Sequence, residues 1–281
     1  MLLVSNREDT MGGDAAPAQR RQRRTSPAVS AVGGSATVRK RLAETQALHW
    51  NRRLFHFLNG YLLVLAFRSF SSKRVFLTTL AVLWTAQLFL EIMRLLNPRL
   101  NALVMVLMGP FMRSQEQHRF SGMVPFILGA LITIALYPKG VAIIAIVVLS
   151  VSDPVAALVG NMVRRYIPEL DHSTRARHNK SLVGSVAGFA AATLTMFVVF
   201  RASSLRPGNT LCLWLNCLVP SAAAMLAEWL TPSPQRTLPL RWFPFALDDN
   251  LLIPLVVALV LQFTVPCLGG VDFDISPWIF L

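Results

Sequence analysis

The sequence has 281 residues, of which 54% are hydrophobic and only 15% are charged, and its formal net charge is +13. A soluble domain of this size could not bury so many apolar side chains, so the composition argues against an ordinary soluble protein. A strong positive charge often indicates nucleic-acid binding, but here the basic residues flank long apolar segments, where they contact anionic lipid and mark the cytoplasmic side of a membrane. We therefore expect a membrane protein with no nucleic-acid partner.

Residues 1–45 are rich in Ala, Gly, Ser, Pro and Arg and have no apolar periodicity. This composition predicts a disordered basic tail on the cytoplasmic side, close to anionic lipid. The apolar start of the chain is too short for the core of a secretory signal peptide, so we do not expect one.

Seven apolar segments approach the ~20 residues that a helix needs to cross a bilayer. Lipid offers the backbone no hydrogen bonds, so such segments must be helical. The first becomes long enough if it starts near Leu48 and if Arg52 and Arg53 extend to the interface. The predicted fold is an all-α polytopic membrane protein with about seven transmembrane helices, in the segments Leu54 to Phe67, Val75 to Leu90, Phe120 to Tyr137, Val141 to Leu158, Leu182 to Phe200, Thr210 to Trp229 and Leu251 to Leu268.

Leu100 to Met112 is apolar over only ~13 residues, which predicts an additional interfacial or re-entrant helix instead of an eighth crossing. With a cytoplasmic tail, residues 91–119, 161–181 and 230–250 then face the cytoplasm. Ionisable residues near a membrane are costly to bury and are therefore candidates for function. Six acidic residues are predicted to lie at this one face: Glu91, Glu116, Asp153, Glu228, Asp248 and Asp249.

Helical spacing places Arg52, His56 and Asn59 on one face of the first segment, with Arg53 beside them. This stripe is either a binding surface for an anion or a positively charged anchor, and the sequence alone favours neither.

Asp153 is followed by Pro154, a pair that is typical of a helix start. We expect Asp153 to cap a broken helix, although a carboxylate at such a break could also hold a divalent cation on a phosphate.

Lys180, Ser181 and Gly184 begin the fifth segment. A helix N-terminus with a nearby lysine and a glycine is a plausible phosphate cradle. The alternative is that Gly184 and Gly188 form a helix-packing face, and both roles are compatible.

Asp248, Asp249 and Asn250 begin the last segment, where at least one should cap the helix. Asp249 is also a candidate metal ligand or general base near Asp153. Two further pairs, Glu91 with Arg94 and Arg113 with Glu116, are spaced for mutual neutralisation. The three cysteines have no metal-ligand spacing, and we interpret them as packing residues.

Together these motifs resemble the CTP-dependent lipid kinases, a family that includes yeast-type diacylglycerol kinase, phytol kinase and dolichol kinase. The resemblance runs in order from Arg52 to Leu261, and its Glu91, Arg113 and Lys-Ser-Leu-x-Gly-Ser parts are closest to the diacylglycerol branch. Arg53 stands where the family often has Lys, and Pro154 where the diacylglycerol branch often has Thr. The motifs are Arg52 to His56 with Gly60, Glu91 with Arg94, Gly109 to Arg113 with Glu116, Phe120 to Gly122, Leu149 to Gly160, Asn179 to Ser185, and Asp248 to Asn250 with Pro254.

The resemblance implies that residues 46–281 form a transmembrane kinase domain, which transfers the γ-phosphate of CTP to a membrane lipid alcohol with Mg²⁺ or Ca²⁺. It implies a location in the endoplasmic reticulum or nuclear envelope, with the active site facing the cytoplasm. The alternative activities are dolichol or phytol kinase and phosphatidate cytidylyltransferase; a membrane transporter is the alternative from another class. Carried over by position, the implied essential residues are Arg52, Arg53, Asp153 and Gly160, with Lys180 as a phosphate ligand. Together with the residues inferred above, the predicted catalytic residues are Asp153, Arg52, Arg53 and Asp249, the nucleotide-binding residues are Lys180, Gly160, Ser181, Gly184 and His56, and the metal ligands are Asp153 and Asp249.

Overall fold

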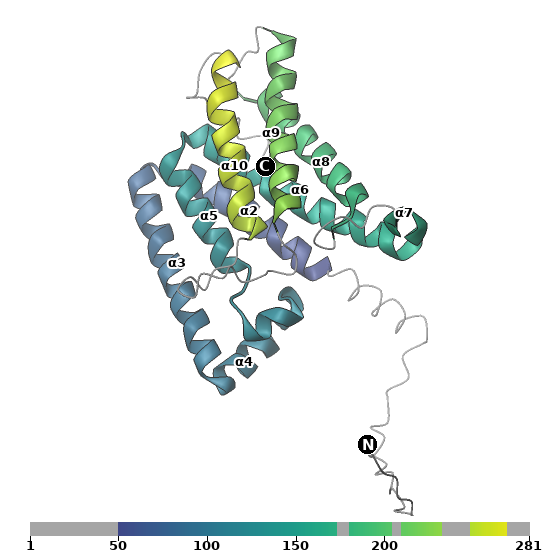
Figure 1. Cartoon of the computed structure of the whole chain (residues 1–281). Coiled ribbons are helices and arrows are strands. Elements are labelled where there is room, and N and C mark those ends of the chain that lie inside the picture. Colours follow the sequence, from purple (N-terminus) through teal and green to yellow (C-terminus); the bar gives the residue numbers. More distant parts are fainter. Residues whose placement is uncertain (1–49, 173–179, 204–208, 232–247, 269–281) are drawn as a thin grey trace, which may run out of the picture. The chain divides into compact units, whose positions relative to one another are not determined.

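The computed structural model describes residues 50–172, 180–203, 209–231 and 248–268, all within one compact unit, Leu42–Leu281 (Figure 1). The expected tail and residues 173–179 of the basic loop lie outside the described residues. Every element in these ranges is helical, as the predicted all-α class requires. The elements are α2 (Trp50–Ser69), α3 (Lys73–Leu96), α4 (Pro98–Met108), η1 (Gly109–Phe111), η2 (Ser114–His118), α5 (Met123–Leu136), α6 (Lys139–Tyr166), α7 (Pro168–His172), α8 (Leu182–Arg201), α9 (Thr210–Leu230), α10 (Asp249–Thr264) and η4 (Val265–Leu268).

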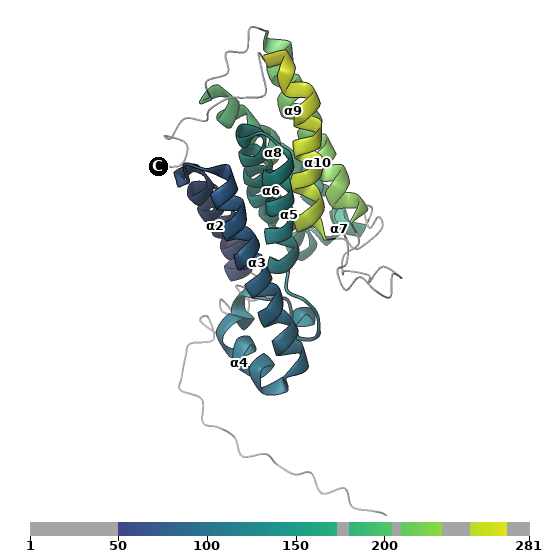
Figure 2. The same cartoon turned by 90° about the vertical axis from the view of Figure 1, so that its left-hand side faces the viewer.

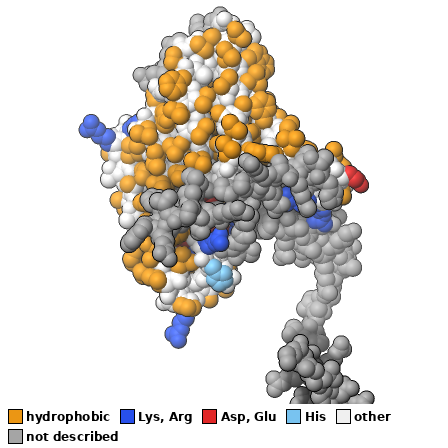
Figure 3. Space-filling model, in the orientation of Figure 1, with side chains coloured by type: hydrophobic (Ala, Val, Ile, Leu, Met, Phe, Trp, Pro, Cys, Tyr) orange, Lys and Arg blue, Asp and Glu red, His pale blue; other side chains and the backbone are white. Residues whose placement is uncertain are grey.

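Five of these helices, α3, α6, α8, α9 and α10, are long and apolar enough to cross a membrane. The first predicted segment lies within α2, and the third corresponds to α5, which is apolar but shorter. Hydrophobic side chains cover most of the described surface in Figure 3, as expected of a surface that faces lipid. The chain is thus a helical membrane protein, and the count of seven crossings stays a prediction.

Helix α4 contains most of the short apolar segment that was not expected to cross the membrane. Its 11 residues rise about 16 Å at 1.5 Å per residue, about half of the hydrocarbon thickness. Asn97 ends α3 and caps α4, because its Oδ1 accepts a hydrogen bond from the Arg99 backbone N at 3.0 Å and Pro98 takes the first helical position. The chain therefore turns sharply at Asn97 (Figure 2), and the length of α4 fits an interfacial or re-entrant helix.

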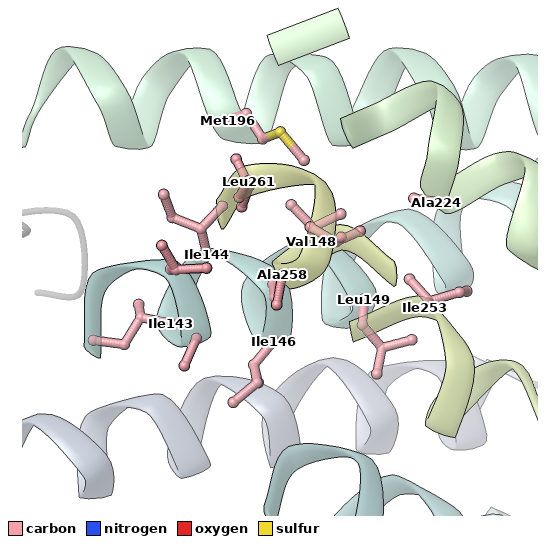
Figure 4. Packing of buried hydrophobic residues seen from close by; sticks show 14 of the residues in the cluster. Ile143, Ile144, Ile146, Val148, Leu149, Met196, Ala224, Ile253, Ala258 and Leu261 are labelled. Atoms are coloured by element: carbon pink, nitrogen blue, oxygen red, sulfur yellow. The ribbon is translucent and has the colours of Figure 1, made fainter. Parts of the chain in front are cut away.

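Helix α6 is the centre of the bundle. In the most apolar stretch of α6, 61% of the residues are buried, whereas in the corresponding stretch of α3 only 17% are buried. Figure 4 shows residues of α6 such as Ile144 and Val148 packed against Met196 of α8 and Leu261 of α10. Since lipid is as apolar as these side chains, close packing stabilises the bundle more than removal from water does. Side chains on α6 are consequently held in fixed positions by neighbours on several sides.

The break predicted at Asp153 is wrong. Helix α6 runs without interruption from Lys139 to Tyr166, with Pro154 inside it, so Asp153 is not an N-cap. Proline removes one backbone hydrogen bond, but a helix that is packed on several sides tolerates this loss. Arg53 of α2 also donates from Nη2 to the carbonyl of Ala157 at 2.9 Å, which ties the two helices together just beyond the proline. Asp153 is therefore presented from the side of a continuous helix.

Gly184 of α8 allows a close approach between α8 and α6. A Cβ at this position would lie 2.6 Å from the carbonyl oxygen of Ala156 and 3.1 Å from the Cα of Gly160. Both are backbone atoms, which cannot move without displacing a helix.

We expect Gly184→Ala to destabilise the protein by about 1–3 kcal/mol, the usual cost of overpacking a tight interface. Gly109→Ala is the matched control, because a Cβ there would meet only the methyl group of Met105 at 3.9 Å. Thermal unfolding in detergent should separate the two variants, and equal melting temperatures would contradict the packing role of Gly184.

Candidate functional site

A cavity of about 240 Å³, which we call the charged cavity, lies at one end of α2 and α8 beside the middle of α6. Eight of the nine predicted site residues line it, and they come from four separate stretches of chain. The exception is Gly184, which packs against α6 as described above. The eight are Arg52, Arg53, His56, Asp153, Gly160, Lys180, Ser181 and Asp249.

Helix α2 presents its cationic stripe to this cavity. Arg52 and His56 are one helical turn apart, and both line the cavity together with Arg53. His56 Nε2 lies 3.9 Å from Asp153 Oδ2, so the α2 stripe faces the carboxylate of α6. Of the two interpretations of the stripe, the binding surface is the one that its place in the cavity favours.

Lys180 directly precedes Ser181, the N-cap of α8, whose hydroxyl accepts from the Gly184 backbone N. The ammonium group lies 3.9 Å from Glu228 Oε1 and 3.8 Å from Asp249 Oδ2, and it also donates to the carbonyl oxygen of Glu228. Lys180 thus connects the start of α8 with the end of α9 and the start of α10, and its charge is shared between two carboxylates.

Asp248 caps α10 as expected, because its Oδ1 accepts from the Asn250 backbone N at 2.9 Å. Burial and the neighbouring Asp249 raise the pKa of Asp248 well above its usual value. Arg113, in the turn between η1 and η2, faces this pair. Burial acts to lower the pKa of Arg113, but the carboxylates of Asp249, Asp248 and Glu116 outweigh it and raise that pKa, so the guanidinium remains charged.

Arg113 and Glu228 line the charged cavity although they were not predicted as site residues. The sequence had singled both out, Arg113 as the partner of Glu116 and Glu228 as an acid at the end of a span. The structure adds an interaction that the sequence did not predict, because Arg113 also faces Asp249, which is more than 130 residues away along the chain. Ser185 also lines the cavity and belongs to the Asn179 to Ser185 motif, although it was not predicted as a site residue, whereas Asn161 had no distinguishing signal of its own.

Several buried polar atoms around the cavity have no hydrogen-bond partner among the described residues. They are Arg53 Nη1, His56 Nε2, Ser185 Oγ and Glu228 Oε2. Buried polar groups are rarely left without a partner, since each costs about 1–3 kcal/mol. Their concentration in one place indicates a polar ligand.

The charges identify the kind of ligand. Five cationic side chains line the cavity, Arg52, Arg53, Arg113, Arg164 and Lys180, against three carboxylates, Asp153, Glu228 and Asp249. An excess of arginine and lysine is suited to a multiply charged anion such as a polyphosphate. Within the described ranges, no group of three or more His, Cys, Asp or Glu side chains is arranged to hold a metal ion by itself.

The structure also contains a buried ion pair away from this cavity. Arg94 Nε and Nη2 donate to the two oxygens of Glu91 at 3.0 and 2.6 Å, as the spacing had predicted. Arg94 additionally binds Asn101 Oδ1 and the carbonyl of Arg119, while Glu91 accepts from the Ser121 backbone N at 2.8 Å. The pair therefore fixes α3 to the start of α4 and to the segment before α5.

The fold and the site define a helical membrane protein with a charged cavity suited to a polyphosphate. Three proteins named CTP-dependent diacylglycerol kinase 1 are similar to it. The protein of Schizosaccharomyces pombe is 28% identical over 181 residues, which are 61% of this chain and 72% of the relative. Those of Saccharomyces cerevisiae and Eremothecium gossypii are 28% and 31% identical over 53% of this chain.

The matches span only about half of the latter two relatives, 49% and 45% of their lengths. No protein-family profile and no solved structure matches the chain. The resemblance to CTP-dependent lipid kinases that the motifs predicted is confirmed by these three relatives.

Proposed function

We propose that this protein is a CTP-dependent diacylglycerol kinase, which transfers the γ-phosphate of CTP to the hydroxyl group of diacylglycerol and gives phosphatidate and CDP. The observation that carries the proposal is the charged cavity, in which a cationic α2 stripe, Lys180 and Asp153 surround one space. The names of the three relatives favour diacylglycerol over dolichol or phytol, and phosphoryl over cytidylyl transfer.

The side chains have separate tasks in this reaction. Phosphoryl transfer is catalysed mainly by positioning and by stabilising charge on the phosphate oxygens. Arg52, Arg53 and Lys180 bind the triphosphate and hold its γ-phosphate toward the acceptor. The lipid hydroxyl oxygen bonds to the γ-phosphorus as the bridging bond to CDP breaks, and the hydroxyl proton passes to a carboxylate, for which Asp249 is the candidate.

Asp153 would hold Mg²⁺ or Ca²⁺, and Asp249 is the candidate for a second ligand as the alternative to its role as base. Mg²⁺ in nucleotide sites commonly uses one or two carboxylates together with phosphate oxygens, so two acidic residues in a cavity of this charge fit the ion. The cation would neutralise part of the negative charge of the triphosphate. In this proposal the site faces the cytoplasm, in the membrane of the endoplasmic reticulum or nuclear envelope, where CTP reaches it directly.

The proposal predicts which nucleotide and which lipid react. Purified protein in detergent with diacylglycerol should incorporate label from γ-labelled CTP into phosphatidate, and label from γ-labelled ATP should be transferred at least about tenfold less, a discrimination of about 1.4 kcal/mol. Dolichol and phytol are tested in parallel with γ-labelled CTP, and phosphatidate is tested with α-labelled CTP. Phosphorylation of dolichol or phytol alone would reassign the acceptor, and transfer of the α-label would indicate a cytidylyltransferase.

A further inference from the structure

A second cavity of about 380 Å³, which we call the apolar cavity, adjoins the charged cavity. Arg52 and His56 line both cavities and thus form a common wall. The remaining lining comes from two further residues of α2, from α3, α4, η1, η2, α5 and the first turn of α10, and from the connections at Met112 and just before α5. Most of it is hydrophobic, with Leu90, Val104, Met108, Phe111, Met123 and Phe126 as the main side chains.

We propose that the apolar cavity binds the lipid alcohol, with its hydroxyl end at the Arg52 and His56 wall and its hydrocarbon portion among the apolar side chains. This inference rests on the proposed kinase activity, since it assigns the acceptor to a place beside the nucleotide cavity. A volume of this size is typical of pockets for small organic ligands. It suits the glycerol part and the first carbons of the chains, while the rest of each chain stays in the bilayer.

Three residues that line the apolar cavity carry a buried polar atom that an amphipathic ligand could bind. His56 Nε2, Ser121 Oγ and Asn250 Oδ1 are buried and have no hydrogen-bond partner among the described residues. All three residues line the apolar cavity. A site for a purely apolar molecule would gain nothing from such groups, whereas a lipid with hydroxyl and ester oxygens can satisfy them.

The cavity also reaches the apolar surface of the protein. Leu90 and Met108 line it and are 42% and 37% exposed, and beside Met108 on α4 lies Leu107, which is 64% exposed. The C-terminal end of α2 contacts α3 through the rings of Phe67 and Phe76, whose centroids are 4.9 Å apart. A lipid can therefore enter the cavity from the bilayer near α4.

The wall between the two cavities explains why the hydroxyl should arrive there. Phosphoryl transfer needs the attacking oxygen in line with the γ-phosphate. A triphosphate in the charged cavity and an alcohol in the apolar cavity would meet at Arg52 and His56, the residues that the two share. Water reaches this wall less readily when lipid fills the apolar side, which protects CTP from hydrolysis.

Val104 offers a direct test, because it lines the apolar cavity and does not line the charged one. Val104→Leu and Val104→Trp fill the cavity in two steps. We expect the KM for diacylglycerol to rise in that order, at least tenfold for Val104→Trp, with the KM for CTP unchanged. Leu103→Trp is the matched control, since Leu103 precedes Val104 on α4 and is 55% exposed on the outer surface.

A binding measurement separates this proposal from the kinase assignment. A diacylglycerol analogue with a diazirine in its acyl chain should label α4 or α5, and the label should be lost in Val104→Trp but kept in Leu103→Trp. Labelling at this site without any lipid phosphorylation would refute the kinase and keep the subsite. Normal diacylglycerol kinetics in Val104→Trp, or labelling only elsewhere on the protein, would refute the subsite. A thermal shift by CTP in each variant verifies that it is folded, and if Val104→Trp lacks that shift, Val104→Leu decides the outcome.

Discussion

Asp153→Asn should lower the rate of CTP-dependent lipid phosphorylation by at least about 100-fold, the effect usually seen when one electrostatic contact of a transition state is removed. The substitution keeps the size of the side chain and removes its charge. Asp153 lies in the middle of the well-packed helix α6, so the fold should tolerate the change. Phosphatidate formation from labelled CTP measures the loss.

The nucleotide affinity of this variant gives a second readout. Without divalent cations, Asp153→Asn should bind CTP as well as the unchanged protein or better, because a negative charge has left the cavity. With Mg²⁺ present, it should lose the additional affinity that the ion gives. Glu169→Gln is the control: Glu169 is exposed on α7 and does not line the charged cavity. An Asp153→Asn protein with normal turnover would remove Asp153 from the mechanism.

The helices themselves were predictable, because apolar segments in lipid have only one way to satisfy their backbone. All seven predicted segments lie in or around helices, and α4 has the shortness expected of a helix that does not cross. The prediction failed at Pro154. A residue pair that starts helices in water can lie inside a helix in a membrane protein, where neighbouring helices compensate for the lost hydrogen bond.

The part of the candidate site that could be predicted consists of the residues that belong to short sequence motifs. Helical spacing placed Arg52 and His56 on one face, and both line the charged cavity. No local pattern indicates that Arg113 faces Asp249 or that Lys180 lies between Glu228 and Asp249, since these contacts join residues 48 or more positions apart. The apolar cavity was not foreseen either, because its walls come from several elements and each contributes ordinary membrane side chains.

Arg94→Met should destabilise the protein by about 3–5 kcal/mol, the usual cost of leaving a buried charge without its partner. Arg94 is fully buried and Glu91 is 3% exposed, so water cannot replace the lost guanidinium. The change also removes the donors to Asn101 Oδ1 and to the Arg119 carbonyl. Thermal unfolding in detergent is the measurement.

The double variant Glu91→Gln with Arg94→Met shows which part of that cost is electrostatic. The neutral amide introduced by Glu91→Gln can still accept from the Ser121 backbone N, but it carries no buried charge, so the double variant should be more stable than Arg94→Met alone. If the two were equally unstable, the lost hydrogen bonds to Asn101 and Arg119 would account for the whole effect.

The same two variants should also affect acceptor binding. Because Glu91 and Ser121 line the apolar cavity, both variants should raise the KM for diacylglycerol more than the KM for CTP. Such a result would connect the buried pair to binding of the acceptor.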